Sequence, residues 1–298
     1  MTVLLTYNVY LCLGVLLIRR FINLIIPSLW TTAKQSLPEV TLPKMGATET
    51  KDYVAHVLCL QGSCSFIYND KQYNIQKNNL LIVREHHLLK DFSLHGKFEV
   101  TVLYINIPFM DSAAPDANFG VRSTLLLMEN PILELTEKEA KVCQDDMNAI
   151  VKRADNRCHA FYLDALAVSC LQFFLDIFHF EDRIYGPTHV PLRSARLIRD
   201  FIKLLQNGEY KLHREVAYYA DKLFVTAKYL SDVCRTVTGH PANYWIHHFV
   251  KIDIRLHLRN RRLSVLEISE KFNFSSPAHF TRYVQAQLGE SPSAIRER

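Results

Sequence analysis

The last hundred residues contain the same two-helix pattern twice, at 216–239 and again at 265–289. Each copy has a short amphipathic segment, a sharp break, and a second amphipathic segment that ends at a glycine. From the second segment onward the copies align at an offset of 50, and one residue of slippage in the turn is the only gap. A single helical corner is a common packing motif, but its duplication predicts two helix-turn-helix units.

Local signals define the start and end of the second helix in each copy. Thr226 and Ser276 can each accept a hydrogen bond from a free amide in the first turn of the helix that follows. Pro277 stands at the first helical position, where its missing N–H costs nothing. Asn273 occupies the break, where we expect a left-handed backbone, and a glycine ends each helix.

The second helix of the first copy separates an apolar stripe from a polar face. The stripe has the spacing i, i+3, i+4 and i+7 and consists of Leu230, Val233, Cys234 and Val237. Arginine in a major groove of DNA can read guanine, and threonine or alanine can contact a thymine methyl group. The positions that we expect to face such a groove are Lys228, Ser231, Asp232 and Arg235 in the first copy and Ala278, Thr281, Arg282 and Gln285 in the second.

The segment that joins the two copies, residues 242–260, reads as one helix with Trp245, Phe249, Ile252 and Leu256 at helical spacing. Its 19 residues would span about 28 Å at about 1.5 Å per residue. That length is close to the repeat of about 34 Å of the DNA duplex. We therefore expect both second helices to enter successive major grooves on one face of the DNA.

Residues 193–298 resemble the AraC/XylS family of transcription regulators, whose DNA-binding module has two helix-turn-helix units joined by a long helix. The most specific part is SVLEISEKFNFSSPAHFTRYVQAQLGESPSAIRER, supported by YLSDVCRTVTGHPANYWI in the first unit. The resemblance implies base contacts from Lys228, Ser231, Asp232, Ala278, Thr281 and Arg282, and contacts to the DNA backbone from Arg235 and Gln285. Asp232 departs from the cation or amide common in the family, so the first unit is expected either to read a cytosine amino group or to contact little.

The charge distribution agrees with a nucleic-acid partner. Residues 193–298 contain 18 Lys+Arg and 10 Asp+Glu, a net charge of +8, whereas residues 1–192 contain 17 and 20, a net charge of −3. The basic excess therefore lies in the C-terminal third. Such an asymmetry suits neutralisation of phosphates and predicts an affinity that falls as salt is added.

Residues 53–107 carry the pattern of a β domain. Five short apolar or alternating runs are separated by turn-forming residues: YVAHVLCLQG, CSFIY, KQYNI, LLIV and FEVTVLYINI. Asn69 and Asp70 suit a hairpin turn, and residues 77–79 suit another. We expect a small cupin-like barrel or sandwich, as the family resemblance also implies. Its aromatic residues either line a ligand cavity or fill the interior: Phe66, Tyr68, Tyr73 and Tyr104.

Two helices are predicted after the β domain, at 133–158 and 160–180. The second carries an apolar stripe formed by Leu163, Leu166, Ala167, Cys170, Phe174 and Ile177. The resemblance implies dimerisation through this region, and packing of the stripe on its own β domain is an equal alternative. The expected fold is α+β, with a cupin-like sensory or dimerisation domain at 46–185, a linker at 186–192 around Gly186, Pro187 and Pro191, and an all-α DNA-binding domain at 193–298.

No catalytic or metal site is expected. Glu85, His86 and His87 are adjacent, with His95 nearby, but neighbouring strand residues point to opposite faces and cannot converge on one ion, so we expect these histidines in a surface loop. The chain has no phosphate-binding glycine loop, zinc-type CxxC pair or nucleophile elbow. Its seven scattered cysteines are typical of reduced core residues in a cytosolic protein.

The first 45 residues allow three interpretations. Residues 2–18 are uncharged and mainly apolar, and Arg19 and Arg20 follow them. The segment is read first as an unstructured extension or as residues upstream of a true start at Met45. It is read second as a membrane anchor that leaves the rest of the chain in the cytoplasm, and third as a packed helix.

The sequence as a whole predicts a cytoplasmic, non-enzymatic transcription regulator that binds double-stranded DNA without a cofactor. RNA polymerase, a small-molecule effector and a second copy of the chain are its other candidate partners. One alternative is a cupin-like enzyme or small-molecule binder whose helical part is a protein-interaction module. The other alternative is a membrane-tethered regulator.

Overall fold

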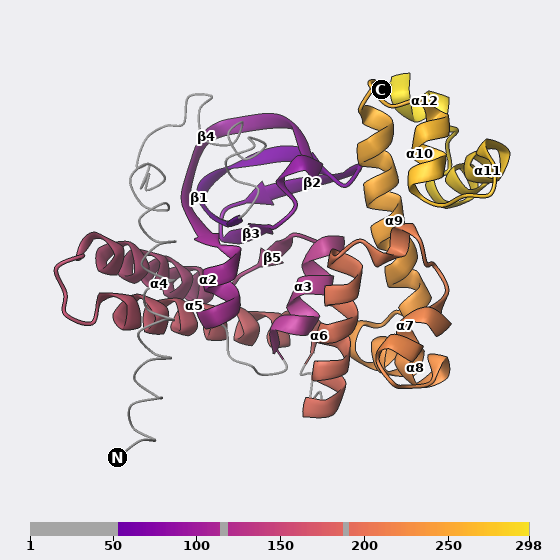
Figure 1. The fold of residues 1–298 in the computed structure, drawn as a ribbon. Helices are drawn as coiled ribbons and strands as arrows, with labels where there is room; N and C mark the ends of the chain where they lie inside the picture. The colour runs from indigo at the N-terminus through magenta and orange to yellow at the C-terminus, as the bar shows by residue number, and fades with distance from the viewer. Residues whose placement is uncertain (1–52, 114–118, 187–190, 298) are drawn as a thin grey trace, which may run out of the picture. The chain divides into compact units, whose positions relative to one another are not determined.

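The computed structural model describes residues 53–113, 119–186 and 191–297, so the N-terminal segment at 1–45 lies outside the described residues. The chain divides into two compact units, 1–116 with 126–187 and 117–125 with 188–298. We call their described parts the sheet unit and the helical unit. The helix α3 (Phe119–Glu129) is divided between them. A curled antiparallel sheet with helices, followed by an all-α unit, confirms the predicted α+β class (Figure 1).

The sheet has five antiparallel strands in the order β2-β1-β3-β5, and β4 pairs with β1. They are β1 (Tyr53–Tyr68), β2 (Lys71–Gln76), β3 (Asn79–Val83), β4 (Leu89–Asn106) and β5 (Ile132–Glu134). Asn69 and Asp70 connect β1 to β2 with φ angles of 49° and 61°. Two consecutive positive φ angles are those of a type I′ hairpin turn, which confirms the predicted turn.

The strands differ from the predicted ones in three places. The first two predicted runs form the single strand β1, because Gly62 lies in an irregular stretch of the β1–β4 ladder instead of in a turn. The strand β4 begins at Leu89, since the polar residues before Phe98 continue the pairing with β1. The strand β5 replaces the start of the predicted helix at 133–158, because it pairs with β3.

Two helices were predicted beside the sheet, and both are present as α4 (Glu137–Asp155) and α5 (Tyr162–Tyr185). Thr136 starts α4 with a capping box, in which Thr136 Oγ1 accepts from the Glu139 N–H and Glu139 Oε2 accepts from the Thr136 N–H at 2.7 Å. A further short helix, α2 (Ile107–Ala113), follows β4 and contacts α5.

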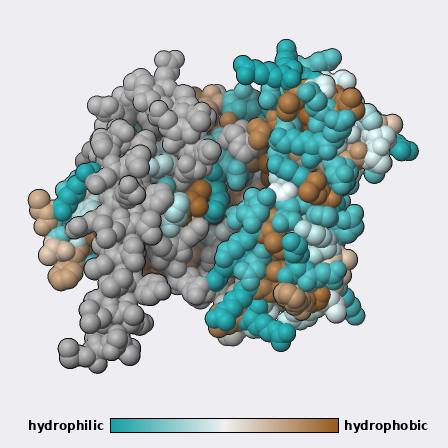
Figure 2. Space-filling model, in the orientation of Figure 1, coloured by the Kyte–Doolittle hydropathy of each residue, from teal (hydrophilic) through white to brown (hydrophobic). Residues whose placement is uncertain are grey.

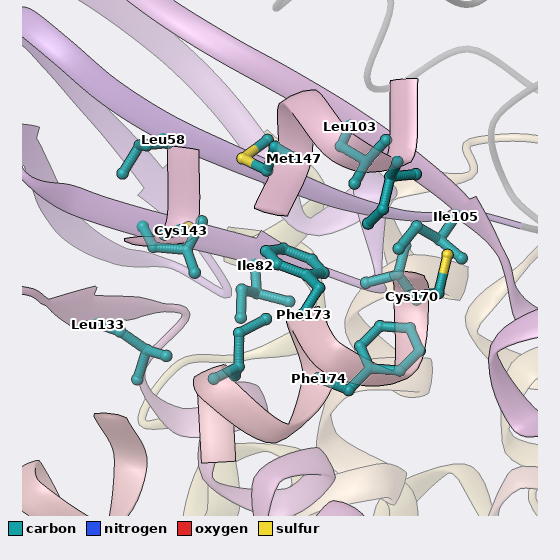
Figure 3. Close-up of a cluster of buried hydrophobic side chains, with 14 of the residues drawn as sticks. Leu58, Ile82, Leu103, Ile105, Leu133, Cys143, Met147, Cys170, Phe173 and Phe174 are labelled. Atoms are coloured by element: carbon teal, nitrogen blue, oxygen red, sulfur yellow. The ribbon is translucent and has the colours of Figure 1, made fainter. Parts of the chain in front are cut away.

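The apolar stripe of α5 packs on the sheet of its own unit. Figure 3 shows Phe173, Phe174 and Cys170 of α5 among side chains of the strands, such as Ile82 and Leu103. Of the predicted stripe, Leu166, Cys170, Phe174 and Ile177 are buried, and Phe173 and Phe180 join them. Among the described helices, α5 alone is long and apolar enough to span a membrane, but this packing accounts for its apolar face.

The aromatic residues of the sheet unit contact one another. Phe66 and Tyr68 are almost fully buried, and the Tyr73 ring lies 5.9 Å from the ring of Phe66. Burial also raises the pKa of Tyr104 to about 12. Tyr73 donates from its hydroxyl to the Glu129 carbonyl oxygen at 2.6 Å. These contacts favour the interpretation that the aromatic residues fill the interior.

The expectation of a surface loop was wrong for His86 and His95. His86 begins a 3₁₀ helix (His86–Leu88), is 4% exposed, and has its Nε2 2.7 Å from the Tyr53 carbonyl oxygen. His95 is exposed but lies in β4, where its Nε2 is 3.0 Å from the Ser65 hydroxyl. In the part of the chain that the structure describes, no group of three or more His, Cys, Asp or Glu side chains is placed to hold a metal ion.

Most of the described cysteines are reduced core residues, as predicted. The buried ones are Cys59, Cys64, Cys143, Cys170 and Cys234. Burial raises the pKa of the thiols of Cys59 and Cys64 to about 11, so neither is activated as a thiolate. Cys158 is exposed, and Cys12 lies outside the described residues.

The contact between α4 and α5 contains two carboxyl groups that interact, those of Asp146 and Asp176. Burial, then the hydrogen bond with Asp176 and the nearby charges of Asp176 and Asp145, raise the pKa of Asp146 to about 7. Because the pKa of Asp146 is higher in the folded than in the unfolded state, protonation of Asp146 stabilises the fold. This stabilisation is fully present below about pH 4, the value of an unperturbed aspartate, and is lost as the pH rises through about 7.

We expect the sheet unit to unfold at a lower denaturant concentration at pH 8 than at pH 5.5. Asp146→Asn should remove most of this difference, because the amide does not ionise. Chemical denaturation followed by circular dichroism measures both midpoints. The control is Asp155→Asn, which is exposed at the end of α4 and should keep the wild-type difference. An equal pH dependence in all three proteins would contradict a role for the Asp146–Asp176 contact.

The helical unit confirms both predicted helix-turn-helix units. The first consists of α7 (Val216–Lys222) and α8 (Ala227–Thr238), and the second of α10 (Val265–Lys271) and α11 (Pro277–Leu288). The other elements are α6 (Leu192–Gln206), the 3₁₀ helix η4 (Glu209–Lys211), α9 (Ala242–Arg259) and α12 (Pro292–Glu297). The helix α9 contacts η4, α7 and α8 as well as α10, α11 and α12, so it is the central helix of the unit.

The connecting helix ends at Arg259, one residue before the predicted end. Its buried residues also cover more of the helix surface than the predicted line of four residues. Trp245 is buried, but Leu256 is 40% exposed. The buried line continues instead through Ile246, Val250, Ile254 and Leu258. Because α9 packs against helices of both helix-turn-helix units, no single stripe of its surface describes its contacts.

Candidate nucleic-acid interface

The second helix of each helix-turn-helix unit is capped as the sequence predicts. Thr226 Oγ1 accepts from the Tyr229 N–H, and Ser276 Oγ accepts from the His279 N–H, both at 3.1 Å. Pro277 is the first residue of α11. Gly239 and Gly289 end the helices in left-handed conformations, with φ angles of 81° and 78°. The sequence therefore defines both ends of each helix locally.

The turns of the two units differ by the one predicted residue. Asn273 has the expected left-handed backbone, with φ of 51°, and Phe224 occupies the equivalent place with φ of 56°. The second unit has Ser275 as an additional residue before its cap, and the Ser275 hydroxyl lies 3.1 Å from His279 Nδ1. The left-handed conformation of Phe224 was not predicted from the sequence, because a bulky side chain rarely adopts it.

The eight predicted DNA-facing side chains all lie on the open side of their helices. Ser231 and Thr281 are half-buried, and the exposed ones are Lys228, Asp232, Arg235, Ala278, Arg282 and Gln285. The opposite side of α8 is closed by the predicted stripe, in which Leu230 and Cys234 are fully buried. Each unit thus presents polar groups from a helix whose other face is held in the core.

The first unit carries an ion pair within its exposed face. Arg235 Nη1 donates to Asp232 Oδ1 at 3.1 Å, and both side chains are more than half exposed. Asp232 therefore reduces the positive charge of α8, whereas the exposed face of α11 carries Arg282 without an acidic residue among its predicted positions. An exposed pair of this kind adds at most about 1 kcal/mol to stability, so it can open when a phosphate competes for the arginine.

Two contacts fix α9 against its neighbouring helices. Trp245 Nε1 donates to Thr238 Oγ1 at 2.8 Å, which joins α9 to the end of α8. In the contact with the second helix-turn-helix unit, His247 Nδ1 of α9 lies 2.8 Å from the Tyr283 hydroxyl of α11. Burial, and then the charges of Lys251 and Arg214, lower the pKa of His247, and burial raises the pKa of Tyr283 to about 12. Both groups are therefore held neutral at physiological pH.

A capping box begins the second helix-turn-helix unit, and its serine followed three residues later by a glutamate is a local signal in the sequence. Ser264 Oγ accepts from the Glu267 N–H at 3.1 Å, and Glu267 Oε2 accepts from the Ser264 N–H at 2.6 Å. The bond from the Ser264 backbone lowers the pKa of Glu267 below its usual value.

Figure 2 shows that the visible surface of the helical unit is mostly hydrophilic, with separate hydrophobic patches.

Among the comparisons with known proteins, a family model identifies the C-terminal part. A family model described as a helix-turn-helix domain matches residues 219–298. Among curated proteins, none matches the sequence. Structures of ToxT from Vibrio cholerae align at 13% identity over 83% of this chain, with 90% of ToxT covered at a TM-score of 0.39 and, for ToxT from strain O395, 89% covered at 0.40.

The AraC-like transcriptional activator CuxR aligns at 10% identity over 72% of this chain and 71% of its own, with a TM-score of 0.33. TM-scores this low do not establish a shared fold. The assignment of a helix-turn-helix domain rests on the family model, together with the two capped helix pairs and the central helix α9. The C-terminal part of this chain, at residues 219–298, is therefore a helix-turn-helix domain.

Proposed function

We propose that this protein is a sequence-specific DNA-binding transcription regulator that reads two successive major grooves with α8 and α11. The observation that carries the proposal is the duplicated unit: two capped helices with polar outer faces lie on one rigid connector. The 18 residues of α9 span about 27 Å at about 1.5 Å per residue, slightly less than one turn of the duplex.

The proposed base contacts come from Lys228, Ser231 and Asp232 of α8 and from Ala278, Thr281 and Arg282 of α11. Arg282 is the best candidate for direct recognition, because an arginine can donate two hydrogen bonds to guanine. Arg235 and Gln285 would contact the DNA backbone. Phosphate contacts position a protein on the duplex without reading its sequence, so the two groups of residues should respond differently to substitution.

The test is selection of bound duplexes from a randomised library by the full chain at two salt concentrations, with Arg282→Ala as the comparison. Wild-type protein should enrich a two-part motif with half-sites about one helical turn apart. Arg282→Ala should reduce discrimination at one base position by about tenfold. Arg262→Ala is the matched control, since Arg262 is an exposed arginine outside both second helices. Binding that depends on salt but enriches no motif would reject sequence recognition.

We also propose that the sheet unit forms a homodimer through the outer face of α5. The predicted apolar stripe of α5 is covered by the sheet, but a second line is exposed seven residues apart: Phe161 is 67% exposed, Val168 65% and Leu175 40%. Residues seven apart occupy equivalent positions of the heptad through which two helices pack side by side. A second copy would present the same line, as a two-fold symmetric interface requires.

Val168→Asp should shift the full chain from dimer to monomer, because it places a charge at the centre of the line. Sedimentation equilibrium over a range of concentrations measures the change. Asp155→Asn, at the exposed end of α4 and outside this line, is the control and should leave the association constant within about threefold of wild type. A wild-type chain that sediments as a monomer at micromolar concentration would reject the dimer. An effector, RNA polymerase and a cytoplasmic location stay predictions of the sequence.

A further inference from the structure

Arg214 joins the two helix-turn-helix units by direct contacts with the turn of the second unit. It precedes α7, in the loop that leads into the first unit. Its Nη1 donates to the carbonyl oxygen of Phe272 at 2.5 Å, and its Nη2 donates to that of Asn273 at 3.2 Å. These two carbonyls belong to the turn of the second unit, 58 and 59 residues further along the chain.

Three more contacts strengthen the same junction. The Arg214 guanidinium lies over the ring of Phe274, with its central carbon 4.3 Å from the ring centroid. Its Nη1 also donates to the Lys211 carbonyl oxygen at 3.2 Å, so the guanidinium is bonded to its own loop as well as to the turn of the second unit. In the reverse direction, Asn273 Nδ2 donates to the Leu212 carbonyl oxygen at 3.5 Å. The leading loop of one unit and the turn of the other are therefore bonded in both directions.

These bonds lie at the turn that leads into the second predicted recognition helix. Phe272 and Asn273 follow α10 directly, where a cation is favoured by the free carbonyls of the helix end. The same turn leads into α11, the second predicted recognition helix, and the Phe274 ring packs 5.1 Å from the ring of Tyr283 on α11. Arg214 lies in the loop that leads into α7, and α7 packs on α8, so a displacement of α11 relative to the first unit disturbs the contacts of Arg214.

We infer that Arg214 is a positioning residue that sets the orientation of the second recognition helix relative to the first, and thus the separation of half-sites that the protein accepts. The part concerning DNA rests on the proposed function. Neighbouring separations differ by about 35° of rotation per base pair, because about 10–10.5 base pairs make one turn. A protein that holds its two helices rigidly will accept one separation, and a protein with a loose junction will accept several.

The first experiment is hydrogen exchange on the full chain without DNA, with Arg214→Lys and Arg214→Met. Lysine keeps the charge but cannot donate to two carbonyls from a planar fork. Both variants should lose about tenfold in amide protection across residues 268–284, while α8 keeps its protection. Arg262→Met is the matched control and should exchange like wild type. Unchanged protection in Arg214→Lys and Arg214→Met would overturn the inference, whether or not the protein binds DNA.

The second experiment measures affinity for duplexes whose two half-sites are moved apart or together by one or two base pairs. Wild-type protein and Arg262→Met should prefer one separation by about tenfold, and Arg214→Lys should reduce this preference to about threefold or less. A loss of affinity that is equal at every separation would overturn the inference, since it would show a charge effect. Failure of wild-type protein to enrich any two-part motif would instead reject the proposed function, and the exchange measurement would still decide the role of Arg214.

Discussion

Replacement of Trp245 by alanine is expected to lower the free energy of unfolding of the helical unit by about 3–5 kcal/mol. Trp245 is fully buried in α9, its Nε1 donates to Thr238 Oγ1, and its ring lies 5.2 Å from the ring of Tyr244. Alanine would leave a large cavity at the contact between α8 and α9 and would free the Thr238 hydroxyl from one partner. DNA binding should be lost in parallel, because α9 holds α8 in place.

Chemical denaturation of the full chain, followed by far-ultraviolet circular dichroism, measures this change. Trp245→Phe keeps most of the packing and removes the hydrogen bond, so it should cost about 1–3 kcal/mol. Leu256→Ala on the same helix is the control for an exposed apolar residue and should cost less than about 1 kcal/mol. Equal costs for Trp245→Ala and Leu256→Ala would contradict the central role of this side chain.

Gly62→Ala is expected to cost the sheet unit about 2–5 kcal/mol. Gly62 has φ of 77°, which an alanine adopts only with strain of about 1–2 kcal/mol. An added Cβ would also lie 2.9 Å from the Lys97 carbonyl carbon and 3.0 Å from Phe98 Cα, both backbone atoms of β4. Since a backbone cannot rotate out of the way as a side chain can, the β1–β4 ladder must shift, at a further cost of about 1–3 kcal/mol.

Gly96→Ala separates these two causes. Gly96 has a similar φ of 73°, but a Cβ added there meets no atom within 4 Å. It should therefore show only the backbone strain, about 1–2 kcal/mol. Thermal or chemical unfolding of the two variants under the same conditions gives the comparison. A cost for Gly62→Ala no larger than that for Gly96→Ala would show that the close approach of β4 is unimportant.

Much of the helical unit could be predicted because its signals are local. Thr226, Ser276 and Pro277 each act within one turn of helix, and the glycine after each helix acts on the preceding carbonyls. Duplication added a second, independent reading of the same pattern, and the one-residue difference in the turn was visible in the alignment of the copies. The exposed positions followed from the buried ones, since a helix with one closed face leaves only the other open.

The sheet unit was harder to predict because its pairing is nonlocal. A glycine between two apolar runs looks like a turn, but pairing with β4 on both sides of Gly62 keeps β1 continuous. Residues 89–97 are too polar to stand out as a strand, and β5 is too short. His86 is buried for the same reason: its environment comes from Tyr53 and Tyr104, which are distant in sequence.

Local sequence signals alone define where the second helix of each helix-turn-helix unit begins and ends, which side of α8 is buried, and which side chains lie on the exposed faces of α8 and α11. These properties depend on capping and on a period of 3.6 residues, both of which act over a few residues. Only the tertiary structure showed that Asp146 meets Asp176 across two helices and that Arg214 reaches the turn at Phe272 and Asn273. Such contacts depend on how the elements pack, because no local pattern relates residues that are 30 or 58 positions apart.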